Sequence, residues 1–180
     1  MTTTKTLYLL CSAAPPVFDV ARVIEDAQAR GWDVCLGLTP TAAHWVSGSL
    51  DGLAVLTGHP VRWQYKFPGE ADVWPAADAL LFAPATFNSL NSWALGLTDR
   101  FAVGVAAEAV GKEGVPVVAM PCLNSALSSH PQFDQSLAVL RGAGVTVLYG
   151  DDGFTPGPAG PDAPPHFPWQ TALDAVTNGR

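Results

Sequence analysis

The chain contains five short apolar runs, most of them followed by a loop and a segment with helical spacing. The first run, residues 6–11, precedes residues 17–30, whose apolar side chains recur every three or four positions. This period is typical of a helix with one buried face. Gly31 then predicts the end of that helix, because glycine adopts the left-handed conformation of a helix C-cap without strain.

The apolar runs predict the strands of one parallel sheet. Short, continuous apolar runs without alternation are typical of strands that are buried on both faces. The later runs are residues 33–38, 79–84, 115–120 and 145–149. Helices are predicted at residues 41–46, 132–141 and 167–176, with one long helix within residues 85–109. Strands that alternate with helices predict an α/β fold: a doubly wound parallel sheet with helices on both faces and right-handed crossovers.

Other stretches of the chain are less regular. Residues 47–68 predict only a short strand near 61–65, and residues 74–77 have the pattern of the end of a short helix. Residues 150–168 are rich in Gly, Pro and Asp without periodicity, which predicts a loop or mobile flap. The length of 180 residues fits one domain. We therefore expect a single domain over residues 1–180, with a flap at about 150–168.

Composition and charge exclude several classes of protein. The net charge is −7, and the nine Lys and Arg residues are scattered. A nucleic-acid partner is therefore not expected. No apolar run is long enough for a membrane span, and residues 6–11 are too short for the apolar core of a signal peptide. We expect a cytoplasmic protein without a membrane partner. With 48% hydrophobic and 14% charged residues, part of its surface should be buried in an oligomer.

The three cysteines do not predict a metal site. Cys11, Cys35 and Cys122 lack the paired spacing of a zinc site, and each lies in an apolar context. The histidines His44 and His130 form no metal-binding pattern either. We therefore predict that the cysteines are small buried side chains and that no metal is bound.

Small polar residues follow four of the predicted strands, in segments 12–14, 39–41, 84–89 and 121–125. Ligands of doubly wound sheets bind outside the carboxyl ends of the strands, near the point where the strand order reverses. None of these segments carries Lys or Arg, so a phosphate would be held by backbone amides, hydroxyls and helix N-termini. Helix capping would explain any one segment, but four on one edge favour a ligand site. The chain has neither GxGxxG nor a P-loop motif.

Two of these segments resemble a known family. Residues 83–89, Ala-Pro-Ala-Thr-Phe-Asn-Ser, followed by Gly96 and Asp99, are similar to the PASANT motif of the homo-oligomeric flavin-containing cysteine decarboxylases. Residues 121–127 with Pro131 resemble the PxMNxxMW motif of the same family. The strand-helix junction at residues 38–45 agrees with the family too, and the likeness spans about residues 6–149.

This resemblance implies a fold, a cofactor and an assembly. The fold would be a flavodoxin-like Rossmann fold with bound FMN, and the assembly a homotrimer or homododecamer with its active site at a subunit interface. The cofactor would be held by Ser12 and Ala13, and by Thr39 and Thr41, with Ser12 and the two threonines on the phosphate side. The isoalloxazine would be lined by Pro84, Ala85, Thr86 and Phe87, with Asn88 at the matching Asn position.

The family's chemistry is the oxidative decarboxylation of a cysteine-type thiol carboxylate. The substrate would be the C-terminal cysteine of a peptide or a related small molecule. Asn124 matches the Asn that grips the substrate carboxylate. A neutral amide can hold a carboxylate without stabilising it so strongly that loss of CO₂ is blocked.

The chain departs from the family at three places. The catalytic His of the family is absent, and Glu70 occupies the position eight residues before Asp78. Either Glu70 or Asp72 serves as the base, or His59 arrives by another loop path, or the chemistry is not decarboxylation. Leu123 and Ser128 replace the Met and Trp of the second motif.

The predicted flap contains no cysteine, which argues against the decarboxylase of the coenzyme A pathway but not against the peptidyl branch. Two alternatives stay open. One is an FMN-dependent flavoprotein without decarboxylase activity, either a reductase or a prenyltransferase-like enzyme. The other is a non-enzymatic oligomeric binding module.

Overall fold

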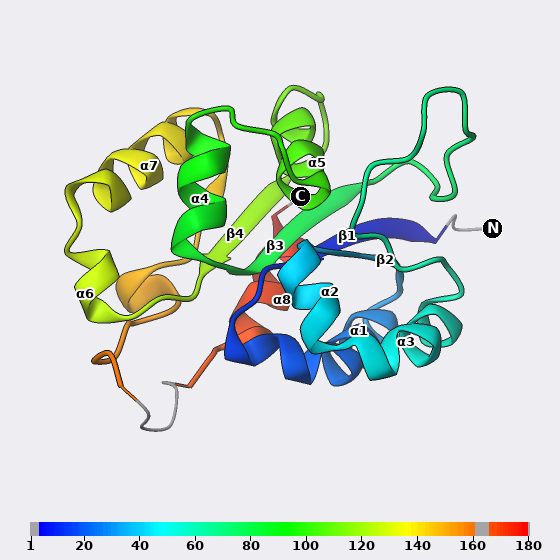
Figure 1. Cartoon of the computed structure of the whole chain (residues 1–180), viewed down its shortest axis with the longest axis horizontal. Helices are drawn as coiled ribbons and strands as arrows, with labels where there is room; N and C mark the ends of the chain where they lie inside the picture. Colours follow the sequence, from blue (N-terminus) through cyan, green and yellow to red (C-terminus); the bar gives the residue numbers. More distant parts are fainter. Residues whose placement is uncertain (1–3, 161–165, 180) are drawn as a thin grey trace.

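The computed structural model describes residues 4–160 and 166–179 (Figure 1). Within them, five parallel strands form one sheet in the order β2-β1-β3-β4-β5. The strands are β1 (Lys5–Cys11), β2 (Trp32–Leu38), β3 (Ala79–Ala85), β4 (Val117–Pro121) and β5 (Thr146–Val147). This order is that of the flavodoxin-like doubly wound sheet, with its switch point between β1 and β3. The predicted fold class is confirmed.

Helices cover both faces of the sheet (Figure 1). One face carries α1 (Val20–Ala29), α2 (Pro40–Trp45), α3 (Leu50–Thr57) and α8 (Trp169–Asn178). The other face carries α4 (Phe87–Ala94), α5 (Phe101–Val110) and α7 (Pro131–Gly142). A short helix, α6 (Ser125–Ser128), joins the end of β4 to α7, and short 3₁₀ turns lie at Pro15–Asp19, Ser47–Ser49 and Gly150–Asp152.

The central strands form because both of their faces are buried. In β1, Leu7 and Leu9 pack into the cluster beneath α1 and α8, whereas Leu10 packs into the cluster beneath α5 and α7. In β3, Leu81 and Phe82 divide between the same two clusters. Burial of each such side chain contributes roughly 1.5–3 kcal/mol. This explains why the apolar runs predicted these strands without alternation.

The predicted long helix at 85–109 is wrong, because the structure has two helices there. The N–H of Leu97 donates to the carbonyl of Ser92 at 2.8 Å, and the N–H of Gly96 donates to that of Trp93 at 3.0 Å. Gly96 has a φ of +72°. These bonds form a Schellman motif, which ends α4 with a glycine in the left-handed conformation. The chain then crosses the surface before α5 begins.

Residues 47–77 also differ from the prediction. Helix α3 occupies Leu50–Thr57, and Arg62 makes only an isolated parallel bridge with Gly37 instead of a strand. No helix ends at residues 74–77. There the chain is irregular because Trp74 turns inward, with its ring 5.0 Å from that of Tyr8.

The predicted flap is packed against the domain over its first half. Phe154 is 1% exposed, and its ring lies 5.7 Å from that of Phe167, which contacts Trp169 of α8. The N–H of Ser125 donates to the carbonyl of Gly157 at 2.8 Å. Residues 150–157 are therefore an irregular loop that packs on the domain through Phe154, as the loop alternative of the prediction describes. Residues 161–165 lie outside the described residues. Among the described helices, none has the length and hydropathy to cross a membrane.

Candidate functional site

The loops that follow β1, β2 and β3 lie side by side at the carboxyl edge of the sheet. The N–H of Ser12 donates to the carbonyl of Pro84 at 2.8 Å, and the N–H of Thr39 donates to that of Cys11 at 3.0 Å. We refer to residues 12–14 and 84–89 together as the β1–β3 edge. It coincides with the switch point of the sheet, where ligands of this fold class bind.

The loop after β4 joins the same edge. The N–H of Cys122 donates to the carbonyl of Ala85 at 2.9 Å. The strand-end segments singled out from the sequence are therefore neighbours in space, as predicted.

Three hydroxyl groups meet at the β1–β3 edge. The Ser12 hydroxyl donates to Ser89 Oγ at 2.8 Å, and the Thr86 hydroxyl donates to the same oxygen at 3.2 Å. Ser12 and Ser89 are each 1% exposed. These bonds join the three hydroxyls into one hydrogen-bonded cluster. Ser89 was not among the predicted site residues. Its spacing of three residues after the N-cap Thr86 was the only local signal.

The two predicted threonines of the second loop differ in their surroundings. Thr39 is 5% exposed and is the N-cap of α2, but its side chain makes no capping hydrogen bond. Thr41 is exposed on the first turn of α2. Because the Thr39 hydroxyl does not cap its helix, it remains available as a donor to a ligand.

The remaining predicted cofactor contacts follow β1 and β3. Ala13 and Phe87 are half-buried, whereas Pro84 and Ala85 are buried within β3. None of these four side chains carries a polar group, so any contact with a flat ring would be apolar.

Asn88 is exposed, and its amide oxygen, in the orientation that satisfies both partners, accepts from the Arg100 guanidinium. Arg100 lies in the connection between α4 and α5. It places a cation beside a segment that has none in its own sequence, which corrects the expectation of a neutral edge.

Asn124 lies where β4 leads into α6. It is half-buried and caps that helix, with Oδ1 accepting from the N–H of Leu127 at 2.9 Å. Because the oxygen is used by the cap, the amide NH₂ group is the part of the side chain left to bind a ligand.

An aromatic group that the sequence did not predict lies between α4 and α7. The ring of Phe87 is 5.5 Å from that of His130, in an edge-to-face arrangement, and 6.4 Å from that of Phe133. Phe133 in turn contacts Tyr149 at 5.0 Å. These rings join the first residue of α4 to the start of α7. Phe87 therefore belongs both to the segment predicted to line the isoalloxazine and to this cluster of aromatic rings.

The structure does not bring Glu70 to the β1–β3 edge of its own chain. Glu70 is exposed in loop 58–78, where its carboxylate accepts from the N–H of Phe67 at 2.9 Å. Asp72 pairs with Lys66 at 2.6 Å, which lowers the pKa of the Asp72 carboxyl through the hydrogen bond and the charge of Lys66. Figure 1 shows this loop on the opposite side of the molecule from α6 and α7. A base from this loop would therefore have to act on another subunit.

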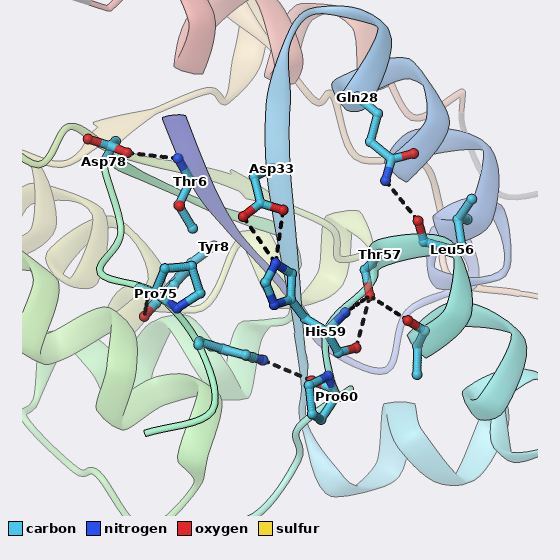
Figure 2. Close-up of polar contacts among 12 residues, drawn as sticks. Thr6, Tyr8, Gln28, Asp33, Leu56, Thr57, His59, Pro60, Pro75 and Asp78 are labelled. Atoms are coloured by element: carbon cyan, nitrogen blue, oxygen red, sulfur yellow. Dashed lines mark hydrogen bonds and ion pairs between the residues drawn. The ribbon is translucent and has the colours of Figure 1, made fainter. Parts of the chain in front are cut away.

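His59 is held at the beginning of β2. Its Nε2 lies 2.9 Å and 3.0 Å from the two carboxylate oxygens of Asp33, and Figure 2 shows its ring facing that side chain. The N–H of His59 also donates to the Thr57 hydroxyl at 3.2 Å. These contacts anchor loop 58–78 to β2, and the Nε2 atom of the imidazole is occupied by Asp33.

Burial suppresses the ionisation of the cysteines. Desolvation raises the pKa of Cys35 and Cys122 to about 12, from 9.0, and also raises the pKa of Cys11. The nearby Asp33 carboxylate adds to the effect at Cys35. A neutral thiol is a poor nucleophile. Cys122, although close to Asn124 in the chain, is therefore a packing side chain at neutral pH.

We predict that Ellman's reagent at pH 8 modifies the thiols of the native protein at least about 100-fold more slowly than those of the unfolded chain. Raised native pKa values also mean that unfolded thiols ionise from about pH 9, before the native ones do. The free energy of unfolding should therefore fall as the pH rises from 9 towards 12. The expected loss is about 1.4 kcal/mol per pH unit for each thiol whose native pKa is raised. Thermal unfolding across this range measures the loss. Rapid labelling of Cys122 in the native state would contradict the assignment.

The fold and the strand-end hydroxyls suit a nucleotide-binding protein, and a family model defines the class as flavin-binding. The model described as Flavoprotein matches residues 1–163. The chain belongs to the Flavoprotein family. This membership bears out the family predicted from the two motifs and agrees with the expected flavin. Among curated protein sequences, none matches the chain significantly.

Solved structures of similar fold cover nearly the whole chain. The FMN-dependent cysteine decarboxylase SpaF has a TM-score of 0.71 at 22% identity, covering 98% of this chain and 97% of its own. The FMN binding protein AtHal3 gives 0.73 at 18% identity, with 98% and 97% covered. The peptidyl-cysteine decarboxylase EPID gives 0.68 at 16% identity, with 97% and 99% covered. At these identities the likeness demonstrates the shared fold.

Proposed function

We propose that the protein binds FMN at the β1–β3 edge and oxidatively decarboxylates a thiol carboxylate, with a peptide ending in cysteine as the preferred substrate. The observation that carries the proposal is the convergence of Ser12, Thr86 and Ser89 at the switch point, with Asn124 on the adjoining loop. Family membership and the similarity to FMN-dependent and peptidyl-cysteine decarboxylases support both the cofactor and the substrate class.

The residues at this edge suit a flavin nucleotide. The half-buried Thr86 at this edge, and Thr39 on the neighbouring loop, offer hydroxyls for the phosphate and ribityl groups, whereas the buried Ser89 bonds Thr86 and Ser12. Pro84, Ala85 and Phe87 offer an apolar surface for the ring system. Neutral donors in a buried setting bind a phosphate through hydrogen bonds whose strength increases because the acceptor is charged.

When bound, oxidised FMN supplies the acceptor for two electrons from the thiol-bearing carbon. The substrate loses two hydrogens in this oxidation, and its CH₂–SH group becomes the CH=S group of a thioaldehyde. Cleavage of the bond to the carboxylate then releases CO₂, and the electron pair moves to sulfur, which gives an enethiol after protonation. Asn124 holds the carboxylate through its NH₂ group, and the apolar neighbours Phe87 and Phe133 keep water from one side of the site.

Incubation of the FMN-loaded protein with a cysteine-terminated peptide tests the proposal. Mass spectrometry should show a loss of about 46 mass units, the sum of CO₂ and two hydrogens, together with bleaching of the flavin absorption. The same peptide ending in serine should be unchanged. A protein that binds FMN but leaves every thiol carboxylate intact would instead be a flavoprotein of another activity. A chain that fails to take up FMN would be a binding module of the same fold.

We further propose that the protein forms a homo-oligomer, a trimer or a dodecamer, through the apolar surface around loop 58–78. Phe67, Leu95 and Leu97 are each more than half exposed. The Tyr65 hydroxyl donates to the carbonyl of Thr98 at 2.6 Å, which holds loop 58–78 against the connection between α4 and α5. Exposed apolar side chains gathered in this way favour a protein interface. Glu70 belongs to the same loop, so the interface would carry it to a neighbouring subunit.

We predict that the double substitution Phe67→Lys and Leu95→Lys converts the oligomer into monomers, because two cations would be buried against an apolar partner surface. The control is Val55→Lys, since Val55 is 84% exposed on α3, on the other face of the sheet. Size-exclusion chromatography with light scattering gives the masses. The proposal fails if the control dissociates as readily as the double variant, or if the wild-type protein is a monomer.

A further inference from the structure

His130 lies at the β1–β3 edge through its contact with Phe87. It is the N-cap of α7, and its ring packs edge-to-face on Phe87 at 5.5 Å, with an interplanar angle of 76°. Phe87 directly follows the N-cap Thr86, whose hydroxyl is one of the three that meet at this edge. Figure 1 shows α7 alongside α4, with α6 leading to it from β4. The loop that carries Asn124 therefore ends at His130.

The hydrogen bonding of His130 defines which ring nitrogen can serve a ligand. Its Nδ1 accepts from the N–H of Gln132 at 3.1 Å, as the cap of α7 requires. A neutral imidazole whose Nδ1 accepts carries its proton on Nε2. The side chain is exposed, so the Nε2–H group is open to a molecule bound beside Phe87. His130 thus presents a neutral donor, and the capping bond opposes the tautomer that could act as a base from Nε2.

We infer that His130 Nε2–H donates a hydrogen bond to the sulfur of the substrate, and so makes the protein selective for thiol carboxylates. This inference rests on the function proposed above. The ring of Phe87, which packs on the ring of Phe133, borders the His130 imidazole. A polarisable sulfur is favourable beside aromatic rings, whereas a carboxylate would lose hydration there. The two ends of the substrate are therefore divided between two neutral donors, with the carboxylate at Asn124 and the sulfur at His130.

A donor at sulfur assists the reaction at two points. The thiol loses its proton to solvent before the carbon is oxidised, and the sulfur then carries a negative charge. After the bond to CO₂ breaks, its electron pair moves onto the same sulfur, until a proton from solvent completes the enethiol. A hydrogen bond fixed at the atom where charge develops stabilises both states. His130 would thus stabilise the charge on sulfur, although no histidine occupies the position expected from the family.

The test compares His130→Asn with the wild-type protein. Asparagine keeps an acceptor for the α7 cap but lacks the distant N–H group. With FMN chemically reduced, so that no oxidation can occur, fluorescence anisotropy gives the affinities for one peptide ending in cysteine or in alanine. The wild-type protein should prefer cysteine by about tenfold or more, and the variant should lose most of that preference. In turnover assays, the acidic limb of the kcat–pH profile should move to higher pH in the variant, because its bound thiol ionises less readily.

His44→Asn is the matched control, since His44 is an exposed histidine near the end of α2. It should keep both the preference for cysteine and the pH profile. Nitrogen NMR of the FMN-free protein should also show the Nε2–H tautomer for His130. A wild-type protein without preference for cysteine, a variant that retains the preference, or an Nδ1–H tautomer would each overturn the inference. A clear preference without any turnover would instead retain His130 and remove the decarboxylase function.

Discussion

Replacing Asn124 by Asp is expected to reduce kcat/KM for a cysteine-terminated peptide by at least about 100-fold. The aspartate oxygen still accepts from the N–H of Leu127, so the cap of α6 is retained. The variant loses the amide donor and places a negative charge against the substrate carboxylate. The unfolding temperature and the flavin spectrum should therefore stay at their wild-type values while turnover is lost. Steady-state kinetics with mass-spectrometric detection of the product measures the effect.

The matched control for this experiment is Asn91→Asp on α4. Asn91 Oδ1 accepts from the Ser136 hydroxyl at 2.7 Å, and an aspartate can accept the same bond. Asn91 makes none of the contacts assigned to FMN or substrate, so turnover should be retained. Equal losses in the two variants would indicate a general effect of charge. An active Asn124→Asp protein would show that another group binds the carboxylate.

The second large effect is expected for Thr39→Val, which should weaken FMN binding by about 10- to 100-fold. The Thr39 side chain is buried but its hydroxyl does not cap α2, so the FMN-free protein loses no capping bond when the hydroxyl is removed. The unfolding temperature of the FMN-free protein should stay the same, because no side-chain cap of α2 is lost. Titration followed by flavin fluorescence gives the affinity, and calorimetry gives the stability.

Thr57→Val should show the opposite pattern. The Thr57 hydroxyl is also buried, but it donates to the carbonyl of Leu53 at 3.0 Å and accepts from the N–H of His59. Its loss should lower the unfolding temperature by about 2–8 °C, without changing the affinity for FMN. If both variants bind FMN normally, the Thr39 hydroxyl is not a ligand of the phosphate or ribityl group.

The sheet could be predicted because its strands are buried on both faces, which leaves apolar runs in the sequence. Helix α3 could not, since Val55 is exposed and apolar, and Gly52 interrupts the segment, so the period of its buried positions is masked. The break between α4 and α5 could not be predicted because apolar residues continue on both sides of Gly96. The bonds of the Schellman motif exist only once the helix is formed.

The candidate site, like the fold, could be predicted from the sequence only in part. The residues after each strand could be assigned to one edge from the order of elements, since parallel strands have their carboxyl ends on the same side. Contacts between particular side chains could not. Ser12 meets Ser89 across 77 positions of sequence. Phe87 meets His130 only because α7 packs on α4. The local pattern around His130 predicts a turn before Pro131, and its nearness to Asn124 in sequence leaves a contact with substrate open.

By itself, the sequence determined the layered α/β class, the edge that holds the polar loops, and the two motifs of the flavoprotein family. These properties depend on local composition and on the order of the elements along the chain. Only the tertiary structure decided that His59 is held by Asp33, that Glu70 lies away from its own edge, and that His130 borders Phe87. Those outcomes follow from how helices and loops pack across the sheet, because packing brings together residues whose spacing in the chain carries no such information.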